Sequence, residues 1–417
     1  MRISEIKPEV WKMAEKAEEM CRERFAEIDK VAEKNTMRVM EAFQDNRVAE
    51  CCFAGTTGYG YDDIGRDTLD KIYAQLFGTE AALVRIGFVN GTHAISTAMF
   101  SLVKPGDTIL SVTGTPYDTI RPAIGIEGDC HGSLKFYGVK YDEVALTPEG
   151  NPDYEGIKAK CADPKVTAVM VQRSIGYDVR RALSVREIGE ICKVVKSVNP
   201  KINIMVDNCY GEFVDVIEPT HVGADLVVGS LIKNPGGGLA PTGGYIAGRK
   251  ELIENASYRM TTPGIGGECG STLGNNRLLF QGLFVAPHVV AQAIKTAVFC
   301  AAMMQQMGIE TSPGINGERN DIIELIKMNS PEKLKKFCAG IQAGAPVDSY
   351  VTPEPWPMPG YNCPVIMAAG AFIQGASIEL SADGPMREPY IAYLQGGITY
   401  ESGKLGIMMA VSAMLDD

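Results

Sequence analysis

Reactive side chains follow two apolar runs of the sequence that are typical of buried strands. Asp207 ends the run INIMVD, and Lys233 follows shortly after Ser230, which ends the run DLVVGS. A small turn, Gly91-Thr92, precedes the helical stretch STAMFSLV. Ligands of open α/β sheets bind beyond the carboxyl ends of the strands. We therefore expect the acid, the lysine and the glycine turn to meet at one site.

Lys233 has the placement of a covalent catalyst. It follows an apolar strand and precedes NPGGGLAPTGG, a glycine-rich stretch that lets a ligand approach the backbone closely. A lysine amine condenses with the aldehyde of pyridoxal phosphate, and once a substrate amine displaces it, the freed amine can move protons at substrate carbons. The alternative, commoner for an isolated lysine, is a side chain that reaches from a strand end into solvent.

Asp207 and the glycine turn favour the cofactor interpretation. Pyridoxal phosphate acts as an electron sink while its ring nitrogen is protonated, and an adjacent carboxylate such as Asp207 favours that form. Gly91 and Thr92 would present backbone N–H groups to the phosphate at a helix start, and Ser230 adds a hydroxyl. Taken alone, Asp207 could equally be a helix cap, and many helices begin with small polar residues.

The apolar pattern predicts the elements that position these residues. From Lys7 to about Arg47 apolar residues recur at helical spacing among many charges, and the glycine-rich loop GTTGYGYDDIG follows. Short apolar runs then alternate with helical stretches. Continuous apolar runs predict a mainly parallel sheet covered by helices on both faces. The seven candidate strands are AALVRI, DTILSV, SLKFYGV, VTAVMVQ, INIMVD, DLVVGS and GGYIAG.

The predicted fold class is therefore α/β, in three parts. Residues 1–60 form an N-terminal helical arm and loop, and residues 61–285 form a large cofactor-binding domain around the seven-stranded sheet. Residues 286–417 form a smaller α+β domain, entered through a connecting helix in APHVVAQAIKTAVFCAAMMQQMG. A chain of 417 residues is longer than one hydrophobic core usually holds, which favours two domains.

Composition argues against several partners. With 51 acidic and 40 basic residues the net charge is −11, which works against binding to nucleic acid or to an anionic membrane. Apolar stretches such as Val365 to Phe372 are interrupted or too short to span a bilayer, and the charged N-terminal helix is unlike a secretion signal. We expect a cytoplasmic protein whose partner is a small molecule.

The remaining motifs exclude other cofactors. Eleven cysteines, an odd number without a secretion signal, indicate reduced thiols. The four histidines are scattered and no CxxC pair is present, so no metal site is expected. The chain lacks GxxxxGK, and it lacks a GxGxxG that follows a strand and opens a helix, so nucleotide and dinucleotide sites lack their fingerprints.

These motifs together resemble those of the Cys/Met-metabolism enzymes of pyridoxal-phosphate fold type I, within them the methionine gamma-lyase-like group often called aluminium resistance proteins. The resemblance covers nearly the whole chain. It implies the fold type I transferase fold and a lyase that cleaves a carbon–sulfur bond of an amino acid by β- or γ-elimination. It also implies homodimers with shared active sites, assembled into homotetramers. Its most specific segments are GYGYDDIGRDTLDKIYAQLFGTEAALVR, VDNCYGEFV and GSLIKNPGGGLAPTGGYIAGR.

The resemblance also assigns roles to individual residues. It implies that Lys233 holds the cofactor as a Schiff base and is the catalytic base, while Asp207 pairs with the pyridine nitrogen. Tyr117 of TGTPYDT would stack on the ring and could protonate the leaving group. His93 would not contact the cofactor directly but would lie next to residues that do. The residues implied to hold the phosphate are Gly91, Thr92 and Ser230.

Two positions depart from the family pattern. Tyr61, reaching in from the neighbouring subunit, fits the family's phosphate-binding tyrosine, but Asp63 stands where an arginine is expected, which leaves Arg66 as the substitute candidate. Typical members hold the substrate carboxylate with an arginine in a late strand, and LGIMMAVSAML has none. Arg387 of DGPMREPY is our replacement candidate, because a guanidinium fork suits a carboxylate, although a solvated surface arginine is an equal alternative.

The reaction itself rests on the resemblance, because no motif encodes the leaving group. An aldolase, racemase or aminotransferase with the same cofactor stays open, since the outcome depends on which substrate bond stands perpendicular to the ring. A non-catalytic cofactor-binding scaffold is disfavoured by the intact Lys233 and Asp207. A nicotinamide enzyme is disfavoured by the missing glycine fingerprint.

Overall fold

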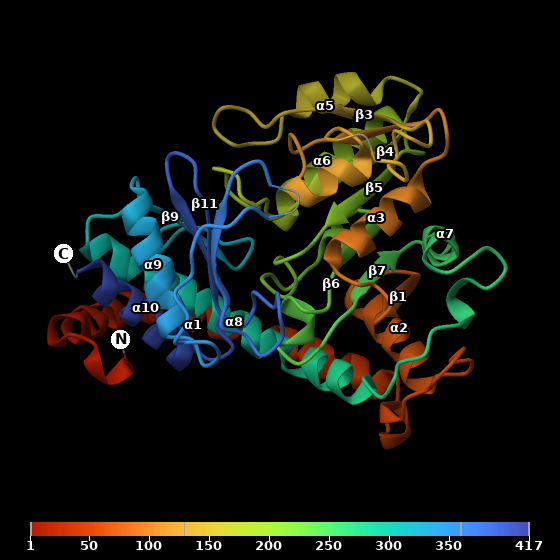
Figure 1. Ribbon diagram of the computed structural model, residues 1–417. Coiled ribbons are helices and arrows are strands. Elements are labelled where there is room, and N and C mark those ends of the chain that lie inside the picture. Colours follow the sequence, from red (N-terminus) through yellow and green to blue (C-terminus); the bar gives the residue numbers. More distant parts are fainter. Residues whose placement is uncertain (1, 129, 359–360, 416–417) are drawn as a thin grey trace.

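The computed structural model of the protein describes residues 2–128, 130–358 and 361–415. Figure 1 shows a large domain around one sheet, a smaller domain around a second sheet, and two long helices that run along both. These helices are α1 (Pro8–Asp45) and α8 (Asn276–Gln306). The predicted helical arm is therefore confirmed as α1.

The large sheet has seven strands in the order β1-β7-β6-β5-β4-β2-β3. β7 runs antiparallel to both of its neighbours, and the other pairs are parallel. The predicted seven-stranded, mainly parallel sheet is thus confirmed. Its strands are β1 (Ala81–Arg85), β2 (Thr108–Ser111), β3 (Lys140–Glu143), β4 (Val166–Gln172), β5 (Asn203–Asp207), β6 (Leu226–Ser230) and β7 (Gly244–Gly248).

One predicted strand is wrong. The run SLKFYGV, residues 133–139, forms turns, and β3 begins directly after it at Lys140. Gly138 adopts a positive φ of 79°, which breaks an extended chain at this point. β3 is an edge strand that pairs only with β2, and its sequence KYDE is polar. The search for apolar runs therefore did not predict it.

Helices cover both faces of the large sheet, as predicted. One face packs against α3 and α7, and the other against α2, α5 and α6. In α6 the buried residues recur every three or four positions, and Ser184 and Glu187 form a capping box at its start. The helices of this domain are α2 (Ile64–Leu76), α3 (Gly91–Leu102), α4 (Arg121–Ile124), α5 (Tyr154–Cys161), α6 (Val185–Val198) and α7 (Lys250–Met260).

The smaller domain is built on an antiparallel sheet of five strands in the order β10-β11-β12-β9-β8. This confirms the predicted smaller α+β domain. Its elements are β8 (Thr311–Ser312), β9 (Ile323–Lys327), α9 (Pro331–Ala343), β10 (Val365–Ala368), β11 (Ser381–Pro385), β12 (Ile391–Gln395) and α10 (Tyr400–Met414). The short 3-10 helices of the chain are η1 (Ile3–Glu5), η2 (Glu50–Phe53), η3 (Asp118–Ile120), η4 (Pro219–Val222), η5 (Asn234–Gly236) and η6 (Gly266–Glu268).

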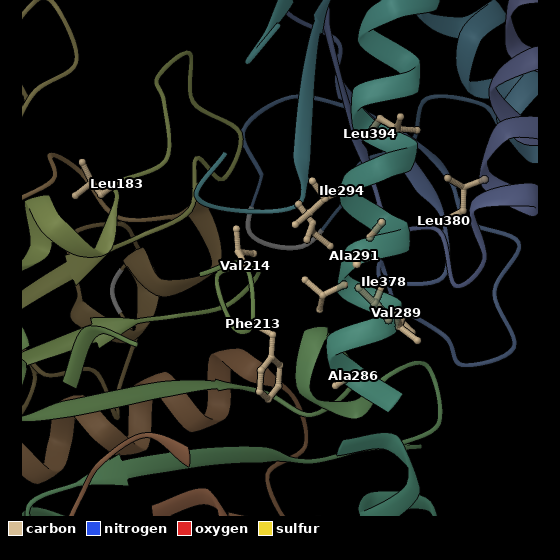
Figure 2. Packing of buried hydrophobic residues seen from close by; sticks show 14 of the residues in the cluster. Leu183, Phe213, Val214, Ala286, Val289, Ala291, Ile294, Ile378, Leu380 and Leu394 are labelled. Carbon is tan, nitrogen blue, oxygen red and sulfur yellow. The ribbon is translucent and has the colours of Figure 1, made fainter. Parts of the chain in front are cut away.

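Helix α8 joins the two domains through one hydrophobic core. Figure 2 shows Ala291 and Ile294 of α8 with Ile378 and Leu394 of the small domain on one side and Phe213 of the large domain on the other. α8 begins at Asn276, before the predicted connecting helix, so the predicted boundary after residue 285 falls inside it. The division into domains at that residue stays a prediction.

By length and composition α8 could cross a bilayer, contrary to the expectation that the apolar stretches are too short. However, 72% of its apolar window is buried inside the protein. A helix that is apolar all round and mostly buried in protein is the pattern of a core helix.

The loop that follows Lys233 rests directly on the backbone of α8. A Cβ atom at Gly282 of α8 would lie 2.3 Å from the carbonyl oxygen of Gly236. A Cβ atom at Gly237, whose φ is +54°, would lie 2.4 Å from the carbonyl oxygen of Gly282. Only glycine permits so close an approach of two backbones.

We predict that Gly282→Ala destabilises the protein by roughly 1–3 kcal/mol, because the added methyl group forces the loop away from α8. This loss opposes the gain of about 1 kcal/mol that alanine brings to a helix interior. Denaturant unfolding of the variant measures it. Gln281→Ala, at the exposed neighbouring position, is the matched control. Equal stability of the two variants would contradict the close backbone contact.

Candidate active site

The predicted reactive residues meet at the carboxyl ends of central strands. Asp207 is the last residue of β5 and Ser230 the last of the adjacent β6, while Lys233 precedes η5. Gly91 is the first residue of α3 and lies against β6, since a Cβ atom there would be 3.1 Å from Cβ of Ser230. The convergence expected from the sequence is therefore present.

The start of α3 and the end of β6 form a cradle that fits a phosphate. Asn90 caps α3 by accepting a hydrogen bond from the His93 N–H at 2.8 Å, so the helix starts at Gly91, before the predicted stretch STAMFSLV. The hydroxyl of Thr92 contacts that of Thr119 at 2.9 Å. Ser230 Oγ is buried and has no hydrogen-bond partner among the described residues. A free buried hydroxyl beside helix N–H groups is suited to an anion.

Asp207 is a buried carboxylate that lacks a cationic partner in the described part of the chain. It is 7% exposed, and its Oδ1 accepts the Cys209 N–H at 3.1 Å. Burial raises the pKa of Asp207 to about 6, and the hydrogen bonds from Cys209 and the charge of Arg180 offset this only in part. A protonated ring nitrogen would supply the missing positive charge. The residues at this position therefore fit pyridoxal phosphate.

The amine of Lys233 points to the small domain. Nζ donates to the Gly375 carbonyl at 2.9 Å and to Ser377 Oγ at 2.6 Å, and it lies 5.1 Å from the centroid of the Tyr210 ring. The Tyr210 and Ser377 hydroxyls are 3.2 Å apart. The half-buried lysine is thus held at the junction of the two domains, and not extended into solvent.

Tyr117 belongs to a cluster of tyrosines. Its ring centroid lies 5.8 Å from that of Tyr177 and 6.2 Å from that of Tyr361, and its hydroxyl hydrogen-bonds to the Tyr361 hydroxyl. Gln172 Oε1 accepts the Tyr117 N–H at 2.8 Å. Burial, with Tyr361 and Tyr210 adding to it, raises the pKa of Tyr117 well above its usual range. Tyr117 therefore keeps its proton at neutral pH and can donate it.

Asp383 of β11 links the small domain to this cluster. Its Oδ2 accepts hydrogen bonds from the Tyr177 hydroxyl at 3.0 Å and from Gln395 Nε2 at 2.9 Å. Burial raises the pKa of Asp383 to about 6, although the Tyr177 bond and the Lys233 charge act in the opposite direction.

The sequence did not predict three residues of this site, Asp383, Tyr361 and Ser377, which come from the small domain. Tyr177 could have been found, because it follows the end of β4.

Arg387 stands at the mouth of a cavity of about 240 Å³ that Tyr117 and Arg180 also line. It is exposed, and its Nη2 donates to the Tyr177 carbonyl at 3.1 Å. The structure thus brings Arg387 near Tyr117, and its predicted substrate contact stays a prediction.

Arg66 is held inside its own chain. Its guanidinium donates to the carbonyls of Gly60, at 2.5 Å, and Gly270, at 3.1 Å, and it pairs with Asp67 at 2.9 Å. Asp63, which stands where an arginine was expected, caps α2 by accepting the Arg66 N–H. Because these contacts bury the guanidinium in its own chain, they give no support to the predicted contact of Arg66 with the phosphate of another subunit.

Tyr61 and His93 make their ring contacts with residues outside the cluster of Lys233, Tyr210 and Ser377. Tyr61 is 57% exposed and stacks on Tyr59 at 5.6 Å between ring centroids. His93 Nδ1 accepts the Val89 N–H at 3.2 Å, and its ring meets Phe88 edge-on. Burial and the nearby Arg259 lower the pKa of His93, so this histidine is neutral and braces the turn before α3.

Other site types find little support in the described residues. No group of three or more potential ligands is arranged for a metal ion there. The eleven cysteines are free thiols.

The chain is similar over nearly its whole length to proteins of one family, described as methionine gamma-lyase, which matches residues 10–415. Protein YnbB of Bacillus subtilis is 49% identical over 93% of this chain and 92% of its own. A solved carbon–sulfur lyase involved in aluminium resistance, from Clostridium novyi, is 52% identical with a TM-score of 0.94, covering 98% of this chain and 96% of the other.

A second solved protein whose name refers to aluminium resistance, from Clostridium acetobutylicum, is 50% identical with a TM-score of 0.95, covering 98% of this chain and 96% of the other. These similarities confirm the resemblance and the fold type predicted from the motifs.

We predict that the stability of the protein falls through Asp383 as the pH rises from about 4 to about 6. The folded-state pKa of Asp383, about 6, is above its ordinary 3.8, so the folded protein binds this proton more tightly than the unfolded chain. Asp383→Asn cannot ionise. The difference in unfolding free energy between variant and wild type should change by at most about 3 kcal/mol between pH 4 and pH 7, in favour of the variant.

Denaturant titrations at several pH values measure this difference, with Asp348→Asn as an exposed control. A difference that is constant with pH would show that Asp383 ionises normally.

Proposed function

Because the chain belongs to the methionine gamma-lyase family, we propose that it is a pyridoxal-phosphate-dependent carbon–sulfur lyase. It cleaves a sulfur-containing amino acid by β- or γ-elimination. The observation that carries this proposal is the meeting of Lys233, the unpaired buried carboxylate of Asp207 and the unpaired buried hydroxyl of Ser230 at the ends of β5 and β6.

Each of these residues has a distinct task toward the cofactor. Lys233 would carry it, Asp207 would face its ring nitrogen, and Ser230 with the N–H groups of Gly91 and Thr92 would hold its phosphate. When bound, pyridoxal phosphate supplies an electron sink for the substrate carbon.

Proton transfer falls to Lys233 and Tyr117. Lys233 Nζ would take the proton from the substrate α-carbon. The Gly375 carbonyl and the Ser377 hydroxyl orient this amine by accepting its hydrogen bonds. The hydroxyl of Tyr117 keeps its proton because the site is buried, and gives it to the leaving sulfur.

We predict that borohydride reduction of the yellow holoenzyme, followed by peptide mapping, locates the cofactor on Lys233. Lys233→Ala should yield no reduced adduct and no elimination activity, because the amine that holds the cofactor and moves the proton is gone. Lys250→Ala, an exposed lysine at the start of α7, is the control and should keep both. Cofactor trapped at another lysine would sink the assignment.

The reaction is tested by release of keto acid from cystathionine, methionine and cysteine. The proposal expects turnover of at least one of them by the wild type and none by Lys233→Ala. Absence of turnover with every sulfur amino acid would remove the lyase activity. Products of transamination or racemisation would point instead to another reaction of the same cofactor.

We also propose that two subunits share each active site, with Tyr61 of one completing the phosphate site of the other. Tyr61 and Tyr59 support this, because two stacked aromatic rings 57% and 69% exposed are suited to an interface. The tetramer and the cytoplasmic location remain predictions.

We predict that mixing Tyr61→Ala and Lys233→Ala subunits restores activity that neither variant has alone. A mixed dimer then contains one site with both residues intact, provided that Tyr61 and Lys233 of one site come from different chains. Activity after joint refolding, compared with each variant refolded by itself, is the measurement. No recovery in a mixture that chromatography shows to contain mixed dimers would place Tyr61 outside the shared site.

A further inference from the structure

Arg180 is a cavity-lining arginine whose hydrogen bonds to other described residues are all with neutral carbonyls. Its Nη1 donates to the Arg181 carbonyl at 3.1 Å, and its Nη2 donates to the Gln172 carbonyl at 3.1 Å and to the Ser174 carbonyl. No carboxylate of the described residues lies within ion-pairing distance of it. A guanidinium has five N–H donors, so Nε–H and one Nη1 hydrogen stay available.

Two other arginines nearby are neutralised by carboxylates. Arg121, which lines the same cavity, pairs with Asp118 at 2.7 Å, and Arg181 pairs with Glu187. Burial lowers the pKa of Arg180, and the charges of Asp178, Asp321 and Asp207 offset this effect in part without contacting it. A partly buried guanidinium with spare donors is favourable only if an anion or water completes its shell.

The position of Arg180 relates it to the cofactor site. Its carbonyl partner Gln172 is the last residue of β4 and lies directly beside Asp207 of β5 in the sheet. The side chain of the same Gln172 holds the backbone of Tyr117. Arg180 is therefore linked through Gln172 to both the ring-nitrogen carboxylate and the predicted stacking ring at the carboxyl ends of β4 and β5, and it lines the 240 Å³ cavity together with Tyr117.

We propose that Arg180 binds the α-carboxylate of the amino-acid substrate, and that Arg387 at the cavity mouth contacts a second anionic group of larger substrates. This inference rests on the proposed lyase function. It supplies the carboxylate contact that the stretch LGIMMAVSAML lacks, a stretch that the structure shows as part of helix α10 and not as a strand. Arg180 has the fixed position for this task, since three carbonyls orient it, whereas exposed Arg387 makes one contact, to the Tyr177 carbonyl.

The two arginines then bind different carboxylates of the substrate. Every α-amino acid carries the carboxylate that Arg180 binds, so loss of Arg180 affects all substrates. Only a substrate with a distal carboxylate, such as cystathionine, reaches Arg387. Charge-assisted hydrogen bonds to a carboxylate are roughly twice as strong as neutral ones, which makes both effects measurable.

The test compares Arg180→Gln, Arg180→Lys and Arg387→Gln in the holoenzyme, with Arg181→Lys as the control on the neighbouring, already paired arginine. Two readouts are needed. The first is kcat and KM for methionine and cystathionine. The second is calorimetric binding of two analogues of methionine, 4-(methylthio)butanoate, which lacks the amine, and 3-(methylthio)propylamine, which lacks the carboxylate.

We expect Arg180→Gln to lower kcat/KM for both amino acids roughly a hundredfold, the loss typical of removing one partner of a buried charged hydrogen bond. It should weaken binding of the butanoate and leave binding of the amine unchanged. Arg180→Lys keeps the charge without the planar fork and should fall between wild type and Arg180→Gln. Arg387→Gln should affect cystathionine alone, and Arg181→Lys neither substrate.

Two outcomes overturn the proposal. If Arg180→Gln and Arg180→Lys weaken binding of the amine as much as that of the butanoate, Arg180 only supports the loop. If Arg387→Gln causes the uniform loss, Arg387 is the carboxylate anchor. Should the wild type turn over no sulfur amino acid, the lyase function fails, while the comparison of the two analogues still decides the role of Arg180.

Discussion

The structure depends on a contact between two backbones, in which the glycine loop after Lys233 rests on Gly282 of α8. Because α8 is also the core helix of both domains, this contact fixes the reactive lysine relative to the large sheet and the small domain at once. A side chain on either surface would separate them. The glycine-rich stretch therefore serves packing as much as it serves the approach of a ligand.

The site that this contact positions lies between the domains. Lys233 from the large domain is held by Gly375 and Ser377, and Tyr177 from the large domain is held by Asp383. Asp207 and Asp383 are buried carboxylates whose pKa is raised to about 6. Burying such groups costs stability, and proteins retain that cost mainly where a charge is needed for function. The arrangement is best explained by a positively charged ligand group and a mobile proton.

Local patterns were sufficient to predict most of the fold. Buried strands such as β4 and β6 are continuous apolar runs. Asp207 and Ser230 end their strands and Lys233 comes three residues after β6, so the rule for strand ends found them. β3 escaped because it is a polar edge strand that needs no apolar face. The early start of α8 escaped because Pro287 lies within it, a residue that usually marks a helix start or break.

The rest of the site could not be predicted, because it depends on contacts between distant segments. Asp383 is distant from Tyr177 in the sequence, and nothing local marks the pair. Arg66 illustrates the same limit, since its charge suggested a phosphate ligand while Asp67 and the carbonyls of Gly60 and Gly270 already bind its guanidinium. The charge of an arginine is visible in a sequence, but its availability is not. Availability is decided by neighbouring acceptors, and by that criterion Arg180, bound only to neutral carbonyls, is better suited to a substrate carboxylate than Arg66 is to a phosphate.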